Sequence, residues 1–291
     1  MNRRIHSKED YAIDIVVCFI GLVFILLTGI PFLHVVSKAF SSESALVGNK
    51  ISFYPIGFQL GTMKYVLSSS QFHSSFLNSV ITTFSGSLLS LVTTAMAGYP
   101  LSKHKLPMRK PLTIIFVFTM WFSGGMVPTY LLMSKLNLTN TLWALILPAS
   151  INVYNLLLVK SYYENIPAAL EESACIDGAS QFRTLFSIVI PLSFPVFATI
   201  TLFLSVGLWN DYFGPMMYIT RSALKTLPVY LRDIIVESQS DTTMVSEEDS
   251  NILPEGVRAA TIVASTVPIL LVYPLLQKYL IKGIMIGAVK G

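Results

Sequence analysis

Charged residues are scarce in this sequence. Only 12% of the 291 residues are Asp, Glu, Lys or Arg, about half the share expected of a soluble protein, whereas 53% are hydrophobic. A chain with so little charge cannot cover a water-exposed surface, so the composition predicts an integral membrane protein. The net charge of +4 is modest and argues against nucleic acid as a partner.

Cysteine and the common catalytic signatures are also missing. The two cysteines, Cys18 and Cys175, lie far apart in sequence and are expected to be free thiols. The sequence contains no Gly-x4-Gly-Lys-Ser/Thr loop, no His-Glu-x-x-His spacing and no nucleophile elbow. We therefore expect no enzyme activity, no metal site and no cofactor in this chain. If ATP supplies energy, a partner must bind it.

Long apolar runs are what the sequence has instead. Six stretches reach the length of about 18 residues that a membrane helix needs. The predicted fold class is an all-α integral membrane protein with six transmembrane helices, in a single domain over residues 1–291. The predicted spans lie near residues 12–36, 76–101, 112–133, 142–159, 185–209 and 259–280.

The distribution of basic residues predicts the orientation. With the N-terminus inside the cell, 12 of the 20 Lys and Arg residues fall on the inner side. The short segment Ser102–Lys110 holds four of them, and the positive-inside rule gives such short loops most weight. Both termini and residues 160–184 are then cytoplasmic. The inner residues are Arg3, Arg4, Lys8, Lys103, Lys105, Arg109, Lys110, Lys160, Arg183, Lys278, Lys282 and Lys290.

The stretch Pro167–Pro195, between the fourth and fifth spans, is built as a short helical projection. Pro167 suits the first turn of a helix, and the residues 168–176 favour helix. Gly178 should end that helix because glycine adopts a positive φ freely. A second helix is expected from about Ser180, and it runs into the apolar residues of the fifth span.

The spacing within this stretch resembles the EAA loop of membrane subunits of binding-protein-dependent ABC importers. That motif reads E-A-A-x3-G-x9-I-x-L-P, and five positions agree in residue type. Ser173 replaces the first alanine and Ile190 replaces the leucine. The agreeing residues are Glu172, Ala174, Gly178, Ile188 and Pro191. We call Pro167–Pro195 the coupling segment, because in that family this helix transmits the motion of the ATPase.

The resemblance implies a set of partners and a location. ATP and Mg would be bound by two copies of a cytoplasmic ATP-binding subunit, to which Glu172, Ser173, Ala174 and Gly178 would couple this chain. A second homologous permease would complete the pathway as a heterodimer, and an extracytoplasmic sugar-binding protein would deliver the cargo. The chain would be a multi-pass protein of the inner or plasma membrane. The ending Lys282–Gly291 resembles that of permeases that import oligosaccharides.

Polar and aromatic residues near the span ends are candidates for the cargo path. Aromatic rings stack on sugar rings, and Asn side chains can bond sugar hydroxyls, so carbohydrate is the expected cargo. For each residue a structural role stays open. Asn78 could serve helix packing, and Tyr154 and Asn155 could form hydrogen bonds between helices. Trp209, Asn210 and Tyr212 could belong to the belt of aromatic and polar residues at the membrane interface. The candidates are Asn78, Tyr154, Asn155, Trp209, Asn210 and Tyr212.

Three local features complete the prediction. Gly124-Gly125 and Pro128 should bend or interrupt the third span. Apolar residues recur with a helical period over 227–235, within the outer segment 210–258, and predict an amphipathic helix. The polar, acidic residues 238–251 predict a mobile loop that could touch a binding protein.

Other functions compete with this prediction. An ABC importer for another small solute would share the coupling motif. A secondary transporter usually holds a charged residue at mid-membrane, and the centres of the six spans contain none. A membrane scaffold without transport would leave the spacing from Glu172 to Pro191 unexplained.

Overall fold

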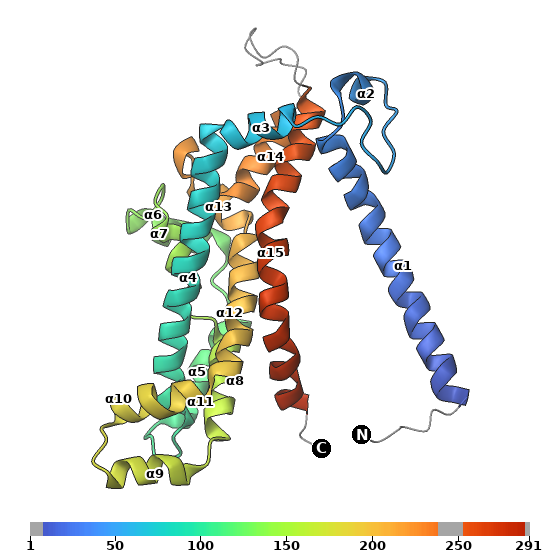
Figure 1. The fold of residues 1–291 in the computed structure, drawn as a ribbon. Coiled ribbons are helices and arrows are strands. Elements are labelled where there is room, and N and C mark those ends of the chain that lie inside the picture. Colours follow the sequence, from blue (N-terminus) through green and yellow to red (C-terminus); the bar gives the residue numbers. More distant parts are fainter. Residues whose placement is uncertain (1–7, 238–252, 289–291) are drawn as a thin grey trace. The chain divides into compact units, whose positions relative to one another are not determined.

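The computed structural model describes residues 8–237 and 253–288, which are helical with no strand among them (Figure 1). The chain divides into two compact units, residues 1–69 with 231–267, and residues 70–230 with 268–291. The predicted loop at 238–251 and the last three residues of the predicted tail lie outside the described residues.

Unit 1 is organised around the C-terminal end of a long apolar helix. Helix α1 (Lys8–Ala39) is exposed along most of its length and is followed by the short helices α2 (Glu43–Val47) and α3 (Gly61–Ser68). A small cluster of Ala45, Leu46 and Ile51 packs with Leu253. Lys38 near the end of α1 forms an ion pair of 2.5 Å with Glu255, in the first turn of α15 (Pro254–Ala288).

Unit 2 contains a central group of three helices, α4 (Ser70–Ser102), α8 (Val153–Glu164) and α12 (Phe194–Trp209). Small residues of α4 let them approach closely. A Cβ atom on Gly86 would lie 2.8 Å from Leu208 Cδ1 of α12, and one on Gly98 would lie 3.3 Å from Val159 Cγ1 of α8. The predicted close packing of span two through small residues is confirmed.

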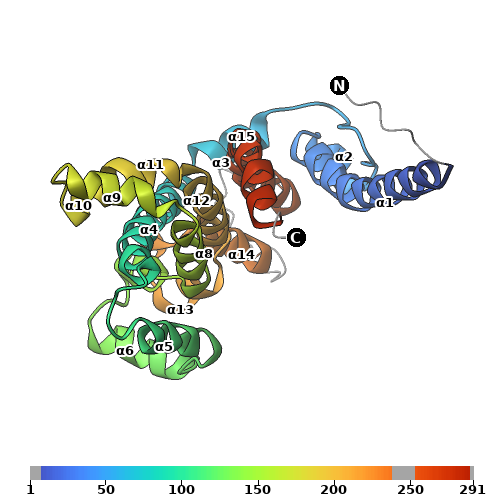
Figure 2. The same ribbon diagram turned by 90° about the horizontal axis from the view of Figure 1, so that it is seen from below.

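Two bent helix pairs flank this centre. Helix α5 (Arg109–Trp121) and α6 (Met126–Lys135) meet at 108°, and Gly125 at the break has φ +89°. The predicted interruption of the third span is therefore confirmed. The second pair bends by 78° where residues Gln181–Leu192 meet α12. Figure 2 shows α9–α11 on one side of α4 and the α5–α6 pair on another.

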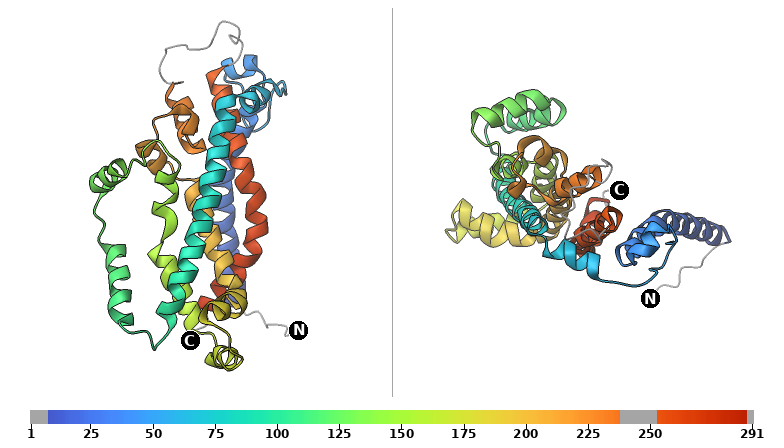
Figure 3. Two further views of the ribbon diagram at one scale, coloured as in Figure 1. Left: turned by 90° about the vertical axis from the view of Figure 1, so that its left-hand side faces the viewer. Right: turned by 90° about the horizontal axis from the view of Figure 1, so that it is seen from above.

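Shorter elements connect these helices. Helix α7 (Trp143–Ile146) and the 3-10 turn η1 (Pro148–Ser150) precede α8. Helix α13 (Phe213–Tyr218) and the 3-10 turn η3 (Ser222–Leu224) follow α12. The predicted amphipathic helix is present as α14 (Leu227–Glu237). Along the length of α4, Figure 3 shows α13 near one end and the coupling segment at the other.

Three described helices are long and apolar enough to cross a membrane, and five spans result if each bent pair counts as one. Helix α15 contains the sixth predicted stretch, residues 259–280. The six-span arrangement stays a prediction.

Candidate functional site

The coupling segment forms a helical hairpin with the predicted boundaries. Helix α9 (Ala168–Ile176) follows Pro167, and α10 (Gln181–Thr184) begins after Ser180, whose hydroxyl accepts a hydrogen bond from Arg183 N. Gly178 has φ +77°, in the left-handed region. Both predicted helices and the predicted glycine turn are confirmed.

The turn at Gly178 closes the carbonyl end of α9. Gly178 N donates to Cys175 O at 3.1 Å, and Ala179 N donates to Ala174 O at 2.9 Å. This pair of bonds is a Schellman motif, which needs a left-handed residue at the first position after the helix. The turn residue is exposed, and a Cβ atom there would meet no atom within 4 Å. Glycine is therefore required at position 178 because of its positive φ, and not because a side chain would collide with a neighbour.

Helix α9 presents different residues to its two sides. Ala174 is 8% exposed, and the carboxylate of Glu171 on the same face reaches the end of α4. Glu172, Ser173 and Cys175 are exposed. Of the motif residues, Ala174 thus faces the chain's own helices, and Glu172 and Ser173 face outward.

Several large apolar side chains of the coupling segment are exposed. Ile176 is 87% exposed, Phe182 is 65% exposed and Leu170 is 43% exposed. Exposed apolar side chains on a segment outside the predicted spans are typical of an interaction site. Glu172 and Asp177 add negative charge to the same short hairpin. This surface can therefore accept a partner with an apolar cleft and basic residues.

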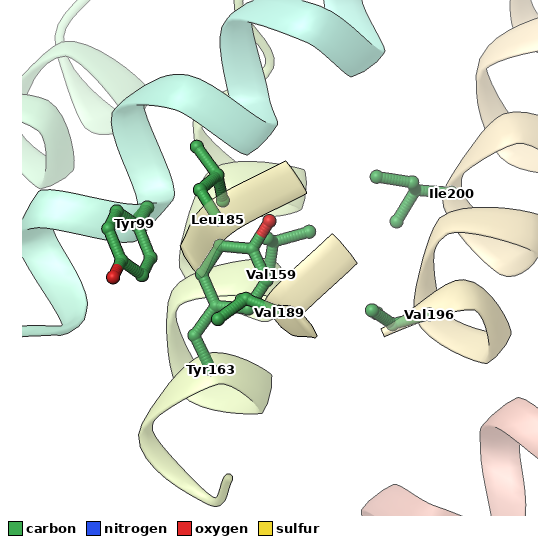
Figure 4. Packing of buried hydrophobic residues seen from close by; sticks show 7 residues of the cluster. All are labelled: Tyr99, Val159, Tyr163, Leu185, Val189, Val196 and Ile200. Atoms are coloured by element: carbon green, nitrogen blue, oxygen red, sulfur yellow. The ribbon is translucent and has the colours of Figure 1, made fainter. Parts of the chain in front are cut away.

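A hydrophobic cluster fixes the base of the hairpin to the central helices. Figure 4 shows Tyr99, Tyr163 and Leu185 close together, with Val159 and Val189 beside them and Val196 and Ile200 contributed by α12. Leu185–Val189 forms a π-helix, η2, before the short helix α11 (Ile190–Leu192). The sequence did not predict this π-helix, an element that often occurs at functional sites.

Side chains around Glu171 form a polar connection that was not predicted from the sequence. Tyr99 Oη donates to Gln181 Oε1 at 3.0 Å and lies 3.4 Å from Glu171 Oε2. Lys103 forms an ion pair with Glu171. No local pattern of residues signals these contacts, because they join residues 68 to 82 positions apart.

A second polar group anchors the preceding loop. Arg109 forms an ion pair with Glu164 at the end of α8, and Lys160 reaches the same carboxylate at 2.9 Å. Arg109 Nε also donates to Leu101 O at 2.8 Å. Two basic residues predicted to lie on the inner side, Lys103 and Arg109, thus connect the end of α4 with α9 and α8, and Lys160 pairs with Glu164 within α8.

The candidate cargo-path residues have mixed surroundings. Asn78 is 7% exposed, and its amide donates to Ala223 O at 2.8 Å and Lys225 O at 3.1 Å. These bonds occupy the amide and support the structural alternative for Asn78. Trp209 at the end of α12 makes an edge contact with Phe76, with ring centroids 5.9 Å apart.

The other candidates do not form one group with Asn78. Tyr154 is 58% exposed and Asn155 is 3% exposed, and both follow η1, whose Ser150 accepts a hydrogen bond from Thr93 in the last third of α4. Asn210 donates to Val206 O of its own helix at 2.9 Å. Tyr212 Oη lies 2.6 Å from Met216 Sδ. Asn78 and Trp209 therefore lie near the first turns of α4, whereas Tyr154 and Asn155 follow a turn that contacts its last third.

Within residues 8–237 and 253–288, no group of three His, Cys, Asp or Glu residues could hold a metal ion, and Cys18 and Cys175 are free and exposed.

Comparison with known proteins identifies the class. The family model "Binding-protein-dependent transport system inner membrane component" matches residues 111–286, so the chain belongs to this family. It is a permease subunit of an ABC importer, a multi-pass protein of the inner membrane and not an enzyme. In such importers partner ATPases handle ATP, and a binding protein is a further partner.

Individual relatives extend the match to nearly the whole chain. The polygalacturonan/rhamnogalacturonan transport system permease protein YtcP of Bacillus subtilis (strain 168) is 41% identical over 272 residues, 93% of this chain and 95% of YtcP. Protein LplC of the same strain is 41% identical over 266 residues, 91% of this chain and 90% of LplC.

A solved structure agrees with the fold. A chain in the crystal structure of a bacterial ABC transporter involved in the import of the acidic polysaccharide alginate is 31% identical, with a TM-score of 0.87. The match covers 95% of this chain and 99% of that chain.

Proposed function

We propose that this permease couples ATP hydrolysis to carbohydrate import through the coupling segment, and that the cargo is an oligosaccharide. The observation that carries the proposal is the two-sided hairpin. Ala174 and Glu171 tie α9 to the chain's own helices, whereas Glu172, Ile176 and Phe182 are left for a partner. A helix that transmits motion between two proteins must contact its own chain on one side and the partner on the other.

The complete assembly follows from this role. The permease pairs with a second homologous permease, two copies of a cytoplasmic ATP-binding subunit dock on the coupling segments, and a sugar-binding protein delivers cargo outside. The chain crosses the membrane six times with both termini in the cytoplasm. Transport proceeds by alternating access, in which ATP binding and hydrolysis shift the helices between two arrangements.

The proposed cargo draws on the relatives and on this chain's aromatic residues. YtcP is named for polygalacturonan and rhamnogalacturonan, and the solved transporter is named for an acidic polysaccharide. Trp209 and Tyr212 lie at and just beyond the end of α12, where they suit contact with sugar rings.

An uptake assay tests the cargo. The complex of both permeases, the ATPase and the binding protein is reconstituted into liposomes and supplied with trigalacturonate, maltotriose or glutamine. We expect ATP-driven uptake of a sugar and none of glutamine. Uptake of glutamine alone would contradict the cargo proposal and would leave the coupling role standing.

A charge reversal tests the coupling role. Glu172→Lys should insert normally but lose co-purification of the ATPase and uptake, because it reverses the charge on the outward side of α9. Glu43→Lys in α2 makes the same change between the first and second predicted spans, on the side predicted to lie outside the cell, and serves as the control. Normal co-purification and uptake by Glu172→Lys would refute the role assigned to Glu172.

A further inference from the structure

Four side chains from three separate elements meet beside the coupling hairpin. Tyr99 lies in the last turn of α4 and Lys103 directly follows that helix, Glu171 lies in α9, and Gln181 begins α10. The Tyr99 hydroxyl is 3.0 Å from Gln181 Oε1 and 3.4 Å from Glu171 Oε2. One oxygen atom therefore faces both arms of the hairpin.

The tyrosine ring holds that hydroxyl in a fixed place. Tyr99 is 6% exposed, and its ring makes an edge contact with Tyr163, with centroids 6.2 Å apart. Lys103 Nζ lies 4.2 Å from the centre of the Tyr99 ring and also pairs with Glu171. The Glu171 side chain is 20% exposed. Water is partly excluded here, which strengthens hydrogen bonds to a charged acceptor.

The turn between the arms is held by two backbone hydrogen bonds, from Gly178 N to Cys175 O and from Ala179 N to Ala174 O. Gly178 is exposed, and a Cβ atom at this position would meet nothing within 4 Å. These two bonds end α9 and involve no residue of α10. Side chains that join the two arms therefore add a restraint on the angle between α9 and α10 that the turn does not supply.

We propose that Tyr99 is a positioning residue, whose hydroxyl sets the angle of the coupling hairpin relative to α4 by joining α9 and α10. Lys103 completes the connection by holding Glu171. This inference rests on the proposed coupling function. It adds that the Tyr99 hydroxyl, together with the ion pair of Lys103 and Glu171, contributes to the transmission of motion from the hairpin to α4.

The chain offers a matched pair of variants for the test. Tyr99→Phe removes the joining hydroxyl and keeps the ring. Tyr163→Phe removes a buried hydroxyl from the same cluster, and within the described part of the chain that hydroxyl has no hydrogen-bond partner. Both changes are equal in size and location, and only the first removes a connection between the arms.

The measurement is the amount of sugar taken up per ATP hydrolysed by the reconstituted complex, with the trigalacturonate and maltotriose probes. We expect Tyr99→Phe to lower this ratio by about three- to tenfold, the effect of one lost hydrogen bond on an equilibrium. ATPase co-purification should be unchanged. Tyr163→Phe should match the wild type in both readouts.

Each contrary result has a distinct meaning. A wild-type ratio for Tyr99→Phe overturns the inference, and so does an equal loss in Tyr163→Phe, which would assign the effect to the cluster as a whole. Gly178→Val in the same assay reports on the proposed function separately. If that variant uncouples transport and Tyr99→Phe does not, the coupling role survives and the inference fails.

A charge exchange covers the case in which Tyr99→Phe fails to assemble. Lys103→Glu and Glu171→Lys should each lower the uptake per ATP, since each places like charges together. The double variant restores the ion pair with its charges exchanged, and we expect it to recover at least about a third of the wild-type ratio. No recovery in an assembled double variant would overturn the inference.

Discussion

Replacing Gly178 by valine should uncouple ATP hydrolysis from transport. The residue has φ +77° and supplies the left-handed position of the turn that ends α9. For a residue with a Cβ atom that conformation costs about 1–2 kcal/mol, and a β-branched residue lies at the upper end. No neighbouring atom lies within 4 Å of the position that the added Cβ atom would occupy, so steric contact adds nothing.

This energy is small compared with the free energy of unfolding of the whole protein, but it is large compared with the energy that holds one turn in its native conformation. A change of 1–2 kcal/mol alters the population of the native turn by a factor of about 5–30. The turn is exposed, so the strain does not reach the cluster around Tyr99 and Val189. Gly178→Val should therefore insert and assemble, while the hairpin takes up other angles.

The assay compares ATPase activity with and without sugar-loaded binding protein. We expect basal hydrolysis by Gly178→Val to persist or fall, and its stimulation by binding protein to be lost. Gly178→Asn is the control at the same position, because asparagine tolerates the left-handed region, as Asn137 and Asn140 do here at φ +53° and +58°. Full stimulation and uptake by the valine variant would refute the reasoning.

Two further predictions concern stability and use the thermal midpoint of the purified protein in detergent. Asn78→Ala removes the two hydrogen bonds to Ala223 O and Lys225 O and should destabilise the protein by about 1–3 kcal/mol. Asn210→Ala, which removes an exposed amide, should have little effect and is the control. Equal midpoints for the two variants would contradict the structural role of Asn78. A Cβ atom in Gly86→Val would lie 2.8 Å from Leu208 Cδ1 unless that side chain shifts, and the repacking should destabilise the protein by about 1 kcal/mol. Gly207→Val, where no atom lies within 4 Å of the added Cβ, is its control, and a smaller loss at Gly86 than at Gly207 would contradict the packing of α4 on α12.

Local features of the coupling segment were predictable because single residues determine them. Pro167 precedes α9, Gly178 supplies the left-handed turn, and Ser180 precedes α10, as their conformational preferences predict. The interruption at Gly125 follows from the same reasoning, although the 108° bend does not. An angle between two helices depends on what packs against each, and sequence preferences do not contain that information.

Contacts between distant parts of the chain were not predictable in this way. In the sequence, Tyr99 is one of several aromatic residues near the ends of spans. Its hydrogen bond to Gln181 joins residues 82 positions apart, so no local pattern predicts it. Asn78 was a candidate for the cargo path because it is polar within an apolar run. Its bonds to the carbonyls of Ala223 and Lys225 show how η3 is held against α4. A polar residue in a span can contact the cargo or form hydrogen bonds within the protein, and only its bonding partners in the structure show which role it has.

The most direct test of the coupling role is a cross-link from the native thiol of α9. Cys175 is exposed on the coupling helix, and Cys18→Ala leaves it as the single cysteine. A short thiol-to-amine cross-linker is added to the assembled complex, and Thr220→Cys in a background without Cys18 and Cys175 is the control. Thr220 is exposed and follows α13, at the other end of unit 2 from α9 (Figure 1). The account predicts a cross-link from Cys175 to the ATP-binding subunit and none from position 220. A complex that assembles without any Cys175 cross-link to that subunit, or that cross-links it from position 220, would contradict the account.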